Sequence, residues 1–165
     1  MLGRCERELL EQLKLEFIPY VAYAKGNYWS KWILENEWDD QENPPNNIQI
    51  APHQIVLESD LEFPHLNLQI AEKISAKLSS QKIPHIIAYT GNKSYHVHFE
   101  ALELLMLPPS KIPQRKKEIA TELIGEELMQ QVDHSNFNSK KLIAKINQPH
   151  RKTGVIKKIV KEVVF

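Results

Sequence analysis

Three carboxylates follow one another at every second position of a short segment near the middle of the chain. Glu58, Asp60 and Glu62 come directly after the apolar run 55–57. Residues two apart on a strand point to the same face, so the three side chains would lie together. Their mutual repulsion and their oxygen ligands favour a hard divalent cation such as Mg²⁺ or Mn²⁺. The alternative is a solvent-exposed face on which the carboxylates only add solubility, because buried unpaired charges are costly.

A second group of polar residues surrounds a predicted tight turn in the segment 90–94. Gly91 permits a turn whose backbone amides can face a phosphate. Thr90 and Ser94 offer hydroxyls, and Lys93 offers a positive charge. This pattern predicts a phosphate-binding turn, and an ordinary hairpin turn is the alternative.

Two histidines follow this turn at alternating positions of a predicted strand over residues 94–99. His96 and His98 share one face, so Tyr95, Val97 and Phe99 lie on the other and are expected to face the core. An imidazole on the open face can hydrogen-bond a phosphate or a reacting group. The alternatives are two surface histidines and a pair that binds a transition metal such as Zn²⁺.

The charge of the chain is unevenly distributed although its formal net charge is zero. Residues 1–100 contain 9 lysines and arginines against 14 acidic residues, whereas residues 101–165 contain 12 against 7. A basic end of this kind suits a polyanion, and a solvated charged surface is the alternative. The basic residues expected to contact phosphates are Lys141, Lys145, His150, Arg151 and Lys152.

Hydrophobic periodicity predicts the elements that would position these residues. Strands are predicted over residues 20–24, 54–61, 83–89, 94–99 and 155–165, and helices over 6–17, 67–80 and 113–131, while 139–146 fits either. The order β–α–β–β–α predicts an α/β (α+β) domain with a sheet of mixed strand direction and flanking helices. Tyr28, Trp29 and Trp32 are expected in the core, with stacking on a nucleic-acid base as the alternative.

Composition sets the broad class. The chain has 165 residues, 42% of them hydrophobic and 25% charged, as in an ordinary globular domain. A single cysteine, Cys5, excludes an intramolecular disulfide and a cysteine-ligated metal cluster within one chain. No apolar run reaches the length of a membrane span, and the first residues do not resemble a signal peptide. We therefore expect one cytoplasmic domain over residues 1–165, with no membrane partner.

The combination of motifs resembles the archaeo-eukaryotic primase superfamily, which includes small catalytic primase subunits and plasmid primase-polymerases. The resemblance covers about residues 50–160, in the family's order of motifs. It comprises the acidic strand 55–60, the phosphate segment 90–97, the acid Asp133 after an apolar residue, and the segment 150–154 (HRKTG). Residues 1–50 form an N-terminal portion that adds no motif. The resemblance implies a sheet with an RRM-like β-α-β-β unit.

The resemblance also implies template-dependent nucleotidyl transfer with two Mg²⁺ or Mn²⁺ ions, as in a DNA primase. Glu58, Asp60 and Asp133 would hold the metals and be catalytic. The triphosphate of the incoming nucleotide would contact Thr90, Lys93, Ser94, His96, Lys145 and His150. A single-stranded DNA template would contact Lys141, Arg151 and Lys152. A primase large subunit or a replicative helicase would be a partner.

Two positions depart from the family pattern. Glu58 stands where the family has Asp and is followed by Ser59 rather than by an apolar residue, and Ser94 stands where a glycine is usual. An alternative alignment takes Asp60 and Glu62 as the acidic pair. These departures leave two other functions open, namely a non-catalytic relative that binds nucleotide or DNA in a replication complex and an unrelated α/β binding module.

Overall fold

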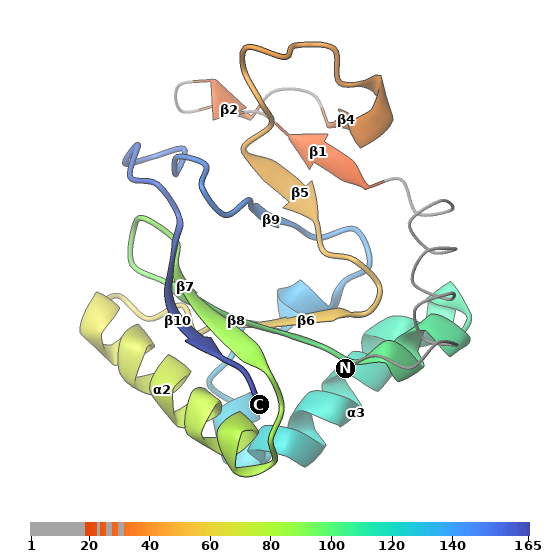
Figure 1. Cartoon of the computed structure of the whole chain (residues 1–165), viewed down its shortest axis with the longest axis vertical. Coiled ribbons are helices and arrows are strands. Elements are labelled where there is room, and N and C mark those ends of the chain that lie inside the picture. The colour runs from red at the N-terminus through yellow and green to blue at the C-terminus, as the bar shows by residue number, and fades with distance from the viewer. Residues whose placement is uncertain (1–18, 23, 26–27, 30–31) are drawn as a thin grey trace.

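The computed structural model describes residues 19–22, 24–25, 28–29 and 32–165 (Figure 1). The helix predicted over residues 6–17 lies outside the described residues. The strands are β1 (Tyr20–Ala22), β2 (Ala24–Lys25), β3 (Tyr28–Trp29), β4 (Ile33–Leu34), β5 (Asn47–Gln49), β6 (Gln54–Leu57), β7 (His85–Tyr89), β8 (Tyr95–Glu100), β9 (Leu142–Ala144) and β10 (Lys158–Val163). The α-helices are α2 (Pro64–Ser80), α3 (Ile112–Ile124) and α4 (Glu126–Met129), and the 3₁₀ helices are η1 (Glu35–Glu37), η2 (Leu102–Met106), η3 (Pro109–Lys111) and η4 (His134–Phe137).

The main sheet has four strands in the order β10-β7-β8-β6. Strand β8 pairs antiparallel with both β6 and β7, and β10 pairs antiparallel with β7. The predicted mixed strand direction is therefore wrong for this sheet, because β8 lies between the two strands that run parallel to each other. The α+β class is confirmed. The register pairs Leu57 with Val97. Glu58, which follows Leu57, therefore lies opposite His96, which precedes Val97.

One face of the main sheet carries the hydrophobic core. Helices α2 and α3 cover this face in Figure 1. The apolar residues that recur at helical spacing in α2 are buried, and they pack with Leu57, Ile87 and Val97 of the sheet; they are Ile70, Ala71, Ile74 and Leu78. Helix α2 begins at Pro64 rather than at Asn67, because proline is well accommodated in the first turn of a helix, where its missing N–H is not needed.

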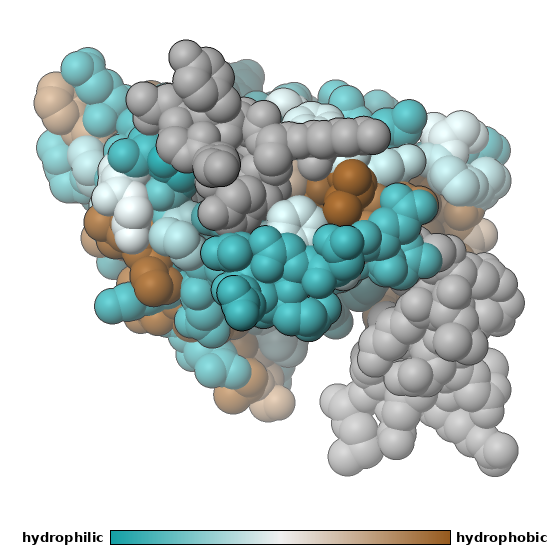
Figure 2. Space-filling view, turned by 90° about the horizontal axis from the view of Figure 1, so that it is seen from above, coloured by the Kyte–Doolittle hydropathy of each residue, from teal (hydrophilic) through white to brown (hydrophobic). Residues whose placement is uncertain are grey.

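A second sheet lies over the other face of the main sheet. Its order is β4-β1-β5-β9, and all its pairs are antiparallel. The ambiguous segment 139–146 thus contributes a strand, which joins the N-terminal part of the chain to the C-terminal part. Between the two sheets Val56 packs with Ile50 and Ile143. Seen from above, the face that carries the loop 38–46 is largely hydrophilic (Figure 2).

One helix prediction and one core prediction need correction. The helix predicted over residues 113–131 is two helices, α3 and α4, since Gly125 adopts φ +88° and ends the first. Trp32, which was expected in the core, is 54% exposed, and the residues that follow it form β4 and the 3₁₀ helix η1. Among the described residues no helix is both long and apolar enough to span a bilayer.

Candidate functional site

The site begins where β6 ends. The strand stops at Leu57, so Glu58, Asp60 and Glu62 do not share a strand face as predicted. Ser59 turns inward, and its hydroxyl donates to Oδ1 of Asn67 at 2.7 Å. Glu58 stays beside the sheet, whereas Asp60 and Glu62 are exposed. The predicted alternation of the three acids fails because the strand ends at Leu57 and the side chain of Ser59 turns into the protein.

The carboxylate of Glu58 is held from two sides. Its Oε2 lies 2.7 Å from Nε2 of His96, and its Oε1 accepts a hydrogen bond from Nδ2 of Asn136 at 3.0 Å. Burial acts to raise the pKa of Glu58, but the electrostatic interaction and hydrogen bond with His96, together with the hydrogen bond from Asn136, outweigh it and lower the pKa to about 2. Glu58 is therefore an anion at neutral pH, and both of its oxygens have partners.

A lysine that the sequence analysis did not single out lies behind His96. Lys157 is completely buried, and its Nζ lies 2.8 Å from Nδ1 of His96, 3.4 Å from Nε2 of His98 and 2.9 Å from the carbonyl oxygen of Ala144. Burial lowers the pKa of Lys157 to about 7, against the opposing charge of Glu58. Burial and the neighbouring Lys157 also lower the pKa values of both histidines.

The predicted phosphate turn is formed and closed by its own residues. The backbone N–H and the hydroxyl of Thr90 both donate to the carbonyl oxygen of Ser94, at 3.1 and 3.0 Å. Gly91 adopts φ +96°, a left-handed conformation that side chains other than glycine rarely take. This geometry makes the turn between β7 and β8 tight, as the sequence predicted.

A second turn, formed by residues 150–155, packs directly on the first. The N–H of His150 donates to the carbonyl oxygen of Val155 at 2.8 Å, which closes the second turn. The hydroxyl of Thr153 donates to the carbonyl oxygen of Gly91 at 2.6 Å, which joins the two turns. A Cβ at Gly91 would clash with the carbonyl oxygen of Val155, so a glycine is required for this contact.

These segments enclose a pocket of about 250 Å³. Its walls include the predicted site residues Glu58, Thr90, Ser94, His96, Lys141, His150 and Arg151. The volume is below the roughly 300–1,000 Å³ typical of sites that hold a whole small molecule. The pocket therefore suits a part of a ligand. The cations Lys141 and Arg151 and the hydroxyl of Ser94 are groups of the kind that bind phosphates.

Other predicted site residues lie outside the walls of this pocket. Asp60 and Lys93 form an exposed pair with an Nζ–Oδ1 distance of 3.1 Å. The Nζ atom of Lys145 lies 3.7 Å from Oε1 of Glu35, and Lys152 is exposed. Thus the structure brings together the phosphate-binding part of the prediction more closely than its acidic part.

Asp133 has a structural role in the described arrangement. Its Oδ1 accepts from the N–H of Ser135 at 2.9 Å and caps η4, as aspartate commonly does at a helix start. Its backbone N–H donates to the carbonyl oxygen of Glu58 at 2.7 Å. The third acid of the motif therefore lies in the segment beside Glu58, although its carboxylate already has a partner.

The chemistry of the acidic residues suits Mg²⁺ or Mn²⁺, because carboxylates are preferred ligands of these ions. Their placement offers no ready-made site for a free ion, since Glu58, Asp60 and Asp133 each have a separate partner. Within the described part of the chain, no three His, Cys, Asp or Glu side chains form a group able to hold a metal. The alternative of a zinc ion on His96 and His98 is also disfavoured, because the amine of Lys157 contacts both rings.

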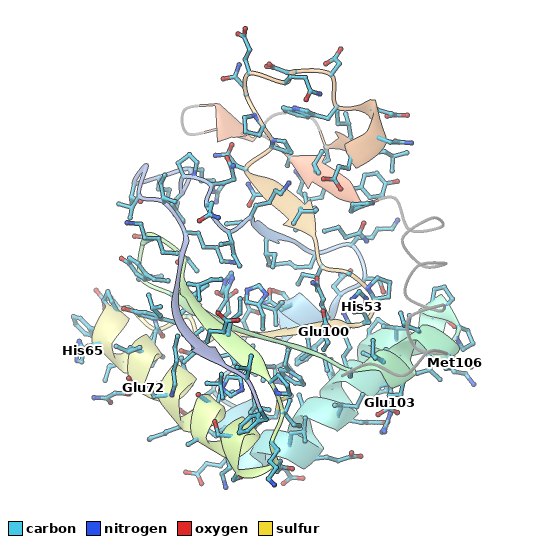
Figure 3. The ribbon with its side chains drawn as sticks, viewed as in Figure 1. His53, His65, Glu72, Glu100, Glu103 and Met106 are labelled. Atoms are coloured by element: carbon cyan, nitrogen blue, oxygen red, sulfur yellow. The ribbon has the colours of Figure 1, made fainter. Side chains whose placement is uncertain are left out.

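A second histidine–carboxylate pair lies at the opposite ends of the same two strands. His53 and Glu100 come close to one another near the start of β6 and the end of β8 (Figure 3). Their Nε2 and Oε1 atoms are 3.8 Å apart, and the side chain of Glu100 is 53% exposed. An ion pair that is open to water contributes little to stability. Glu58 with His96 is the better-organised pair, because it is shorter and both of its side chains are largely buried from water.

The two acids should differ in their effect on stability. Asp60→Asn is expected to change the free energy of unfolding by less than about 0.5 kcal/mol, because Asp60 is exposed. Glu58→Gln is expected to cost about 2–3 kcal/mol, because it removes a buried charge that His96, Asn136 and Lys157 surround. Urea unfolding of both variants at pH 7 measures this difference. Equal losses would contradict the burial of Glu58.

Comparisons with known proteins found no relative of this chain. No protein-family model, no curated protein and no solved structure matches the chain.

Proposed function

We propose that the pocket binds the phosphate groups of a nucleoside triphosphate, and that the chain is a template-dependent nucleotidyltransferase of the primase type. The observation that supports this most is the packing of the turn 150–155 on the turn 90–94, beside Glu58 and His96. Two motifs more than 50 residues apart in sequence thus form adjoining walls of one pocket. Both motifs belong to the resemblance on which the expected function rests.

The charges of the pocket support a polyanion as its ligand. Lys141 and Arg151 line the pocket, as do Thr90 and Ser94. Burial and the nearby charges of Arg151 and Lys152 lower the pKa of His150, so its imidazole is neutral and can accept or donate a hydrogen bond. The base and sugar of the nucleotide would lie outside this small pocket.

A divalent metal would bind together with the nucleotide rather than before it. Glu58 and Asp60 would hold the ion together with the phosphates, where it would supply charge neutralisation and activation of the attacking hydroxyl. Magnesium is usually held by one or two carboxylates together with phosphate oxygens of the substrate. Since the described carboxylates form no group of three, we expect Mn²⁺ binding to be measurable only with nucleotide present, which calorimetric titration in both orders would test.

The proposed binding site is tested with paired charge-removing variants. Lys141→Met with Arg151→Met should weaken nucleoside triphosphate binding by at least tenfold, because two phosphate-facing cations are lost. Lys73→Met with Lys77→Met on the exposed side of α2 removes the same charge and should change affinity by less than twofold. Isothermal titration measures both. Equal effects in the two double variants would contradict the pocket as the binding site.

Catalysis is tested separately, by incorporation of a labelled nucleotide on a single-stranded DNA template with Mn²⁺. Incorporation that Asp60→Ala and Glu58→Ala abolish would support the transferase. Binding without incorporation would instead support the second function, a non-catalytic nucleotide-binding relative. That alternative is favoured by one observation, the engagement of both Glu58 oxygens by His96 and Asn136.

A further inference from the structure

The buried amine of Lys157 has as many acceptors as an ammonium has hydrogens. Its Nζ lies within 3.4 Å of a ring nitrogen of His96, a ring nitrogen of His98 and the carbonyl oxygen of Ala144. An ammonium carries three N–H donors and no lone pair, whereas a neutral amine carries only two. Three acceptors around one fully buried nitrogen therefore favour the charged form of Lys157.

This arrangement determines where the proton of His96 resides. A ring nitrogen that accepts from an ammonium cannot itself carry a hydrogen, so Nδ1 of His96 is unprotonated. The proton of the neutral ring is then on Nε2, which lies 2.7 Å from Oε2 of Glu58. The opposite tautomer would direct two donors at each other across 2.8 Å and a lone pair at a carboxylate across 2.7 Å.

The charges in this chain of contacts also balance. Lys157 is positive, His96 is neutral and Glu58 is negative, so one cation and one anion are buried together. Burying either charge alone is costly, and removing one partner of such a pair leaves the other uncompensated. The same geometry makes Nε2 of His98 an acceptor, which leaves its proton on Nδ1.

We propose that Lys157 is a positioning residue that fixes His96 as the neutral tautomer with its proton on Nε2. His96 thereby presents an N–H donor to the pocket side of the sheet, where it holds Glu58. That a phosphate oxygen of the nucleotide takes this donor over in the bound state rests on the proposed function. The tautomer itself follows from the contacts of Lys157 alone.

The tautomer can be observed without any ligand. Long-range ¹H–¹⁵N NMR spectra of the ¹⁵N-labelled protein distinguish protonated from unprotonated ring nitrogens. At pH 6.5 we expect His96 to have a protonated Nε2 and an unprotonated Nδ1, and His98 to have the reverse. A protonated Nδ1 on His96, alone or together with Nε2, would overturn the proposal.

A pair of lysine variants separates positioning from mere stability. Lys157→Met should bring the Nδ1-protonated form of His96 into the spectrum and weaken nucleoside triphosphate binding by at least fivefold. Lys116 is a suitable control, because it is also buried and its amine donates to the carbonyl oxygen of Ala51, at 3.1 Å, rather than to a histidine ring. Lys116→Met should leave the His96 signals and nucleotide affinity unchanged.

The outcomes distinguish this proposal from the proposed function. An unaltered His96 tautomer in Lys157→Met would overturn the positioning role. If Lys157→Met does not fold, the wild-type spectrum alone decides. The expected tautomer in a protein that binds no nucleotide would support the role of Lys157 and contradict only the proposed function.

Discussion

Replacing Gly91 by alanine should destabilise the protein by about 2–4 kcal/mol and abolish nucleotide binding. Two effects add at this position. The backbone has φ +96°, which costs a residue with a Cβ roughly 1–2 kcal/mol. The new Cβ would also clash with the carbonyl oxygen of Val155 and approach Cβ of His150 to 3.1 Å. Relief of the clash requires the turn 150–155 to move away from the pocket.

Gly154→Ala provides the matched control for this variant. Gly154 has φ +73°, yet a Cβ there would meet no atom within 4 Å. The Gly154→Ala variant should therefore lose only the free energy of the strained backbone conformation, about 1–2 kcal/mol, and retain nucleotide affinity. Urea unfolding and isothermal titration measure the two properties. If Gly91→Ala bound nucleotide as well as Gly154→Ala does, the contact between the two turns would not be needed for the pocket.

The stability of the protein should rise by a few kcal/mol between about pH 7 and pH 10. Burial lowers the pKa of Lys157 from 10.5 to about 7 and that of Lys116 to about 8. Between these values and 10.5 the unfolded chain binds more protons than the folded one. Proton linkage therefore raises the free energy of unfolding as the pH increases through this range, and the penalty for burying the two charges is fully present below it.

Lysine variants assign this pH dependence. Lys116→Met should flatten the rise above about pH 8, and Lys157→Met should flatten the part that begins near pH 7. Urea unfolding at intervals of half a pH unit gives the curves. A wild-type stability that falls between pH 7 and pH 9 would contradict the burial of both ammonium groups.

The sequence predicted well those parts of the protein that depend on local patterns. The alternation around His96 correctly separated its face from that of Val97, because side chains of a strand alternate between faces. The turn at Gly91 and the apolar stripe of α2 were predicted correctly for similar reasons. Each of these features depends only on residues that are close together in the sequence.

Features that depend on long-range contacts were not predicted. Lys157 is one of 12 lysines and arginines in the C-terminal 65 residues, and nothing in its sequence neighbourhood distinguishes it from those that are exposed. Asn136 was missed because asparagine is common in turns and loops for local structural reasons. The exposure of Trp32 depends on which elements pack against its segment. Tryptophan is highly buried on average, and the prediction based on that average was wrong for Trp32.

The order of the pocket's walls along the chain has a consequence for folding. The strands β6, β7 and β8 and the helices α2 and α3 are contiguous in sequence, whereas the pocket needs the pairing of β5 with β9 and the contact of Lys157 with His96, 61 residues away. Contacts between distant residues form slowly because the intervening loop must first close. We therefore expect strands β6, β7 and β8 and their helices to fold first, and β10 and the pocket to form last. A ligand that contacts both walls would hold this late-forming closure in place, and its binding energy would add directly to the stability of the folded state.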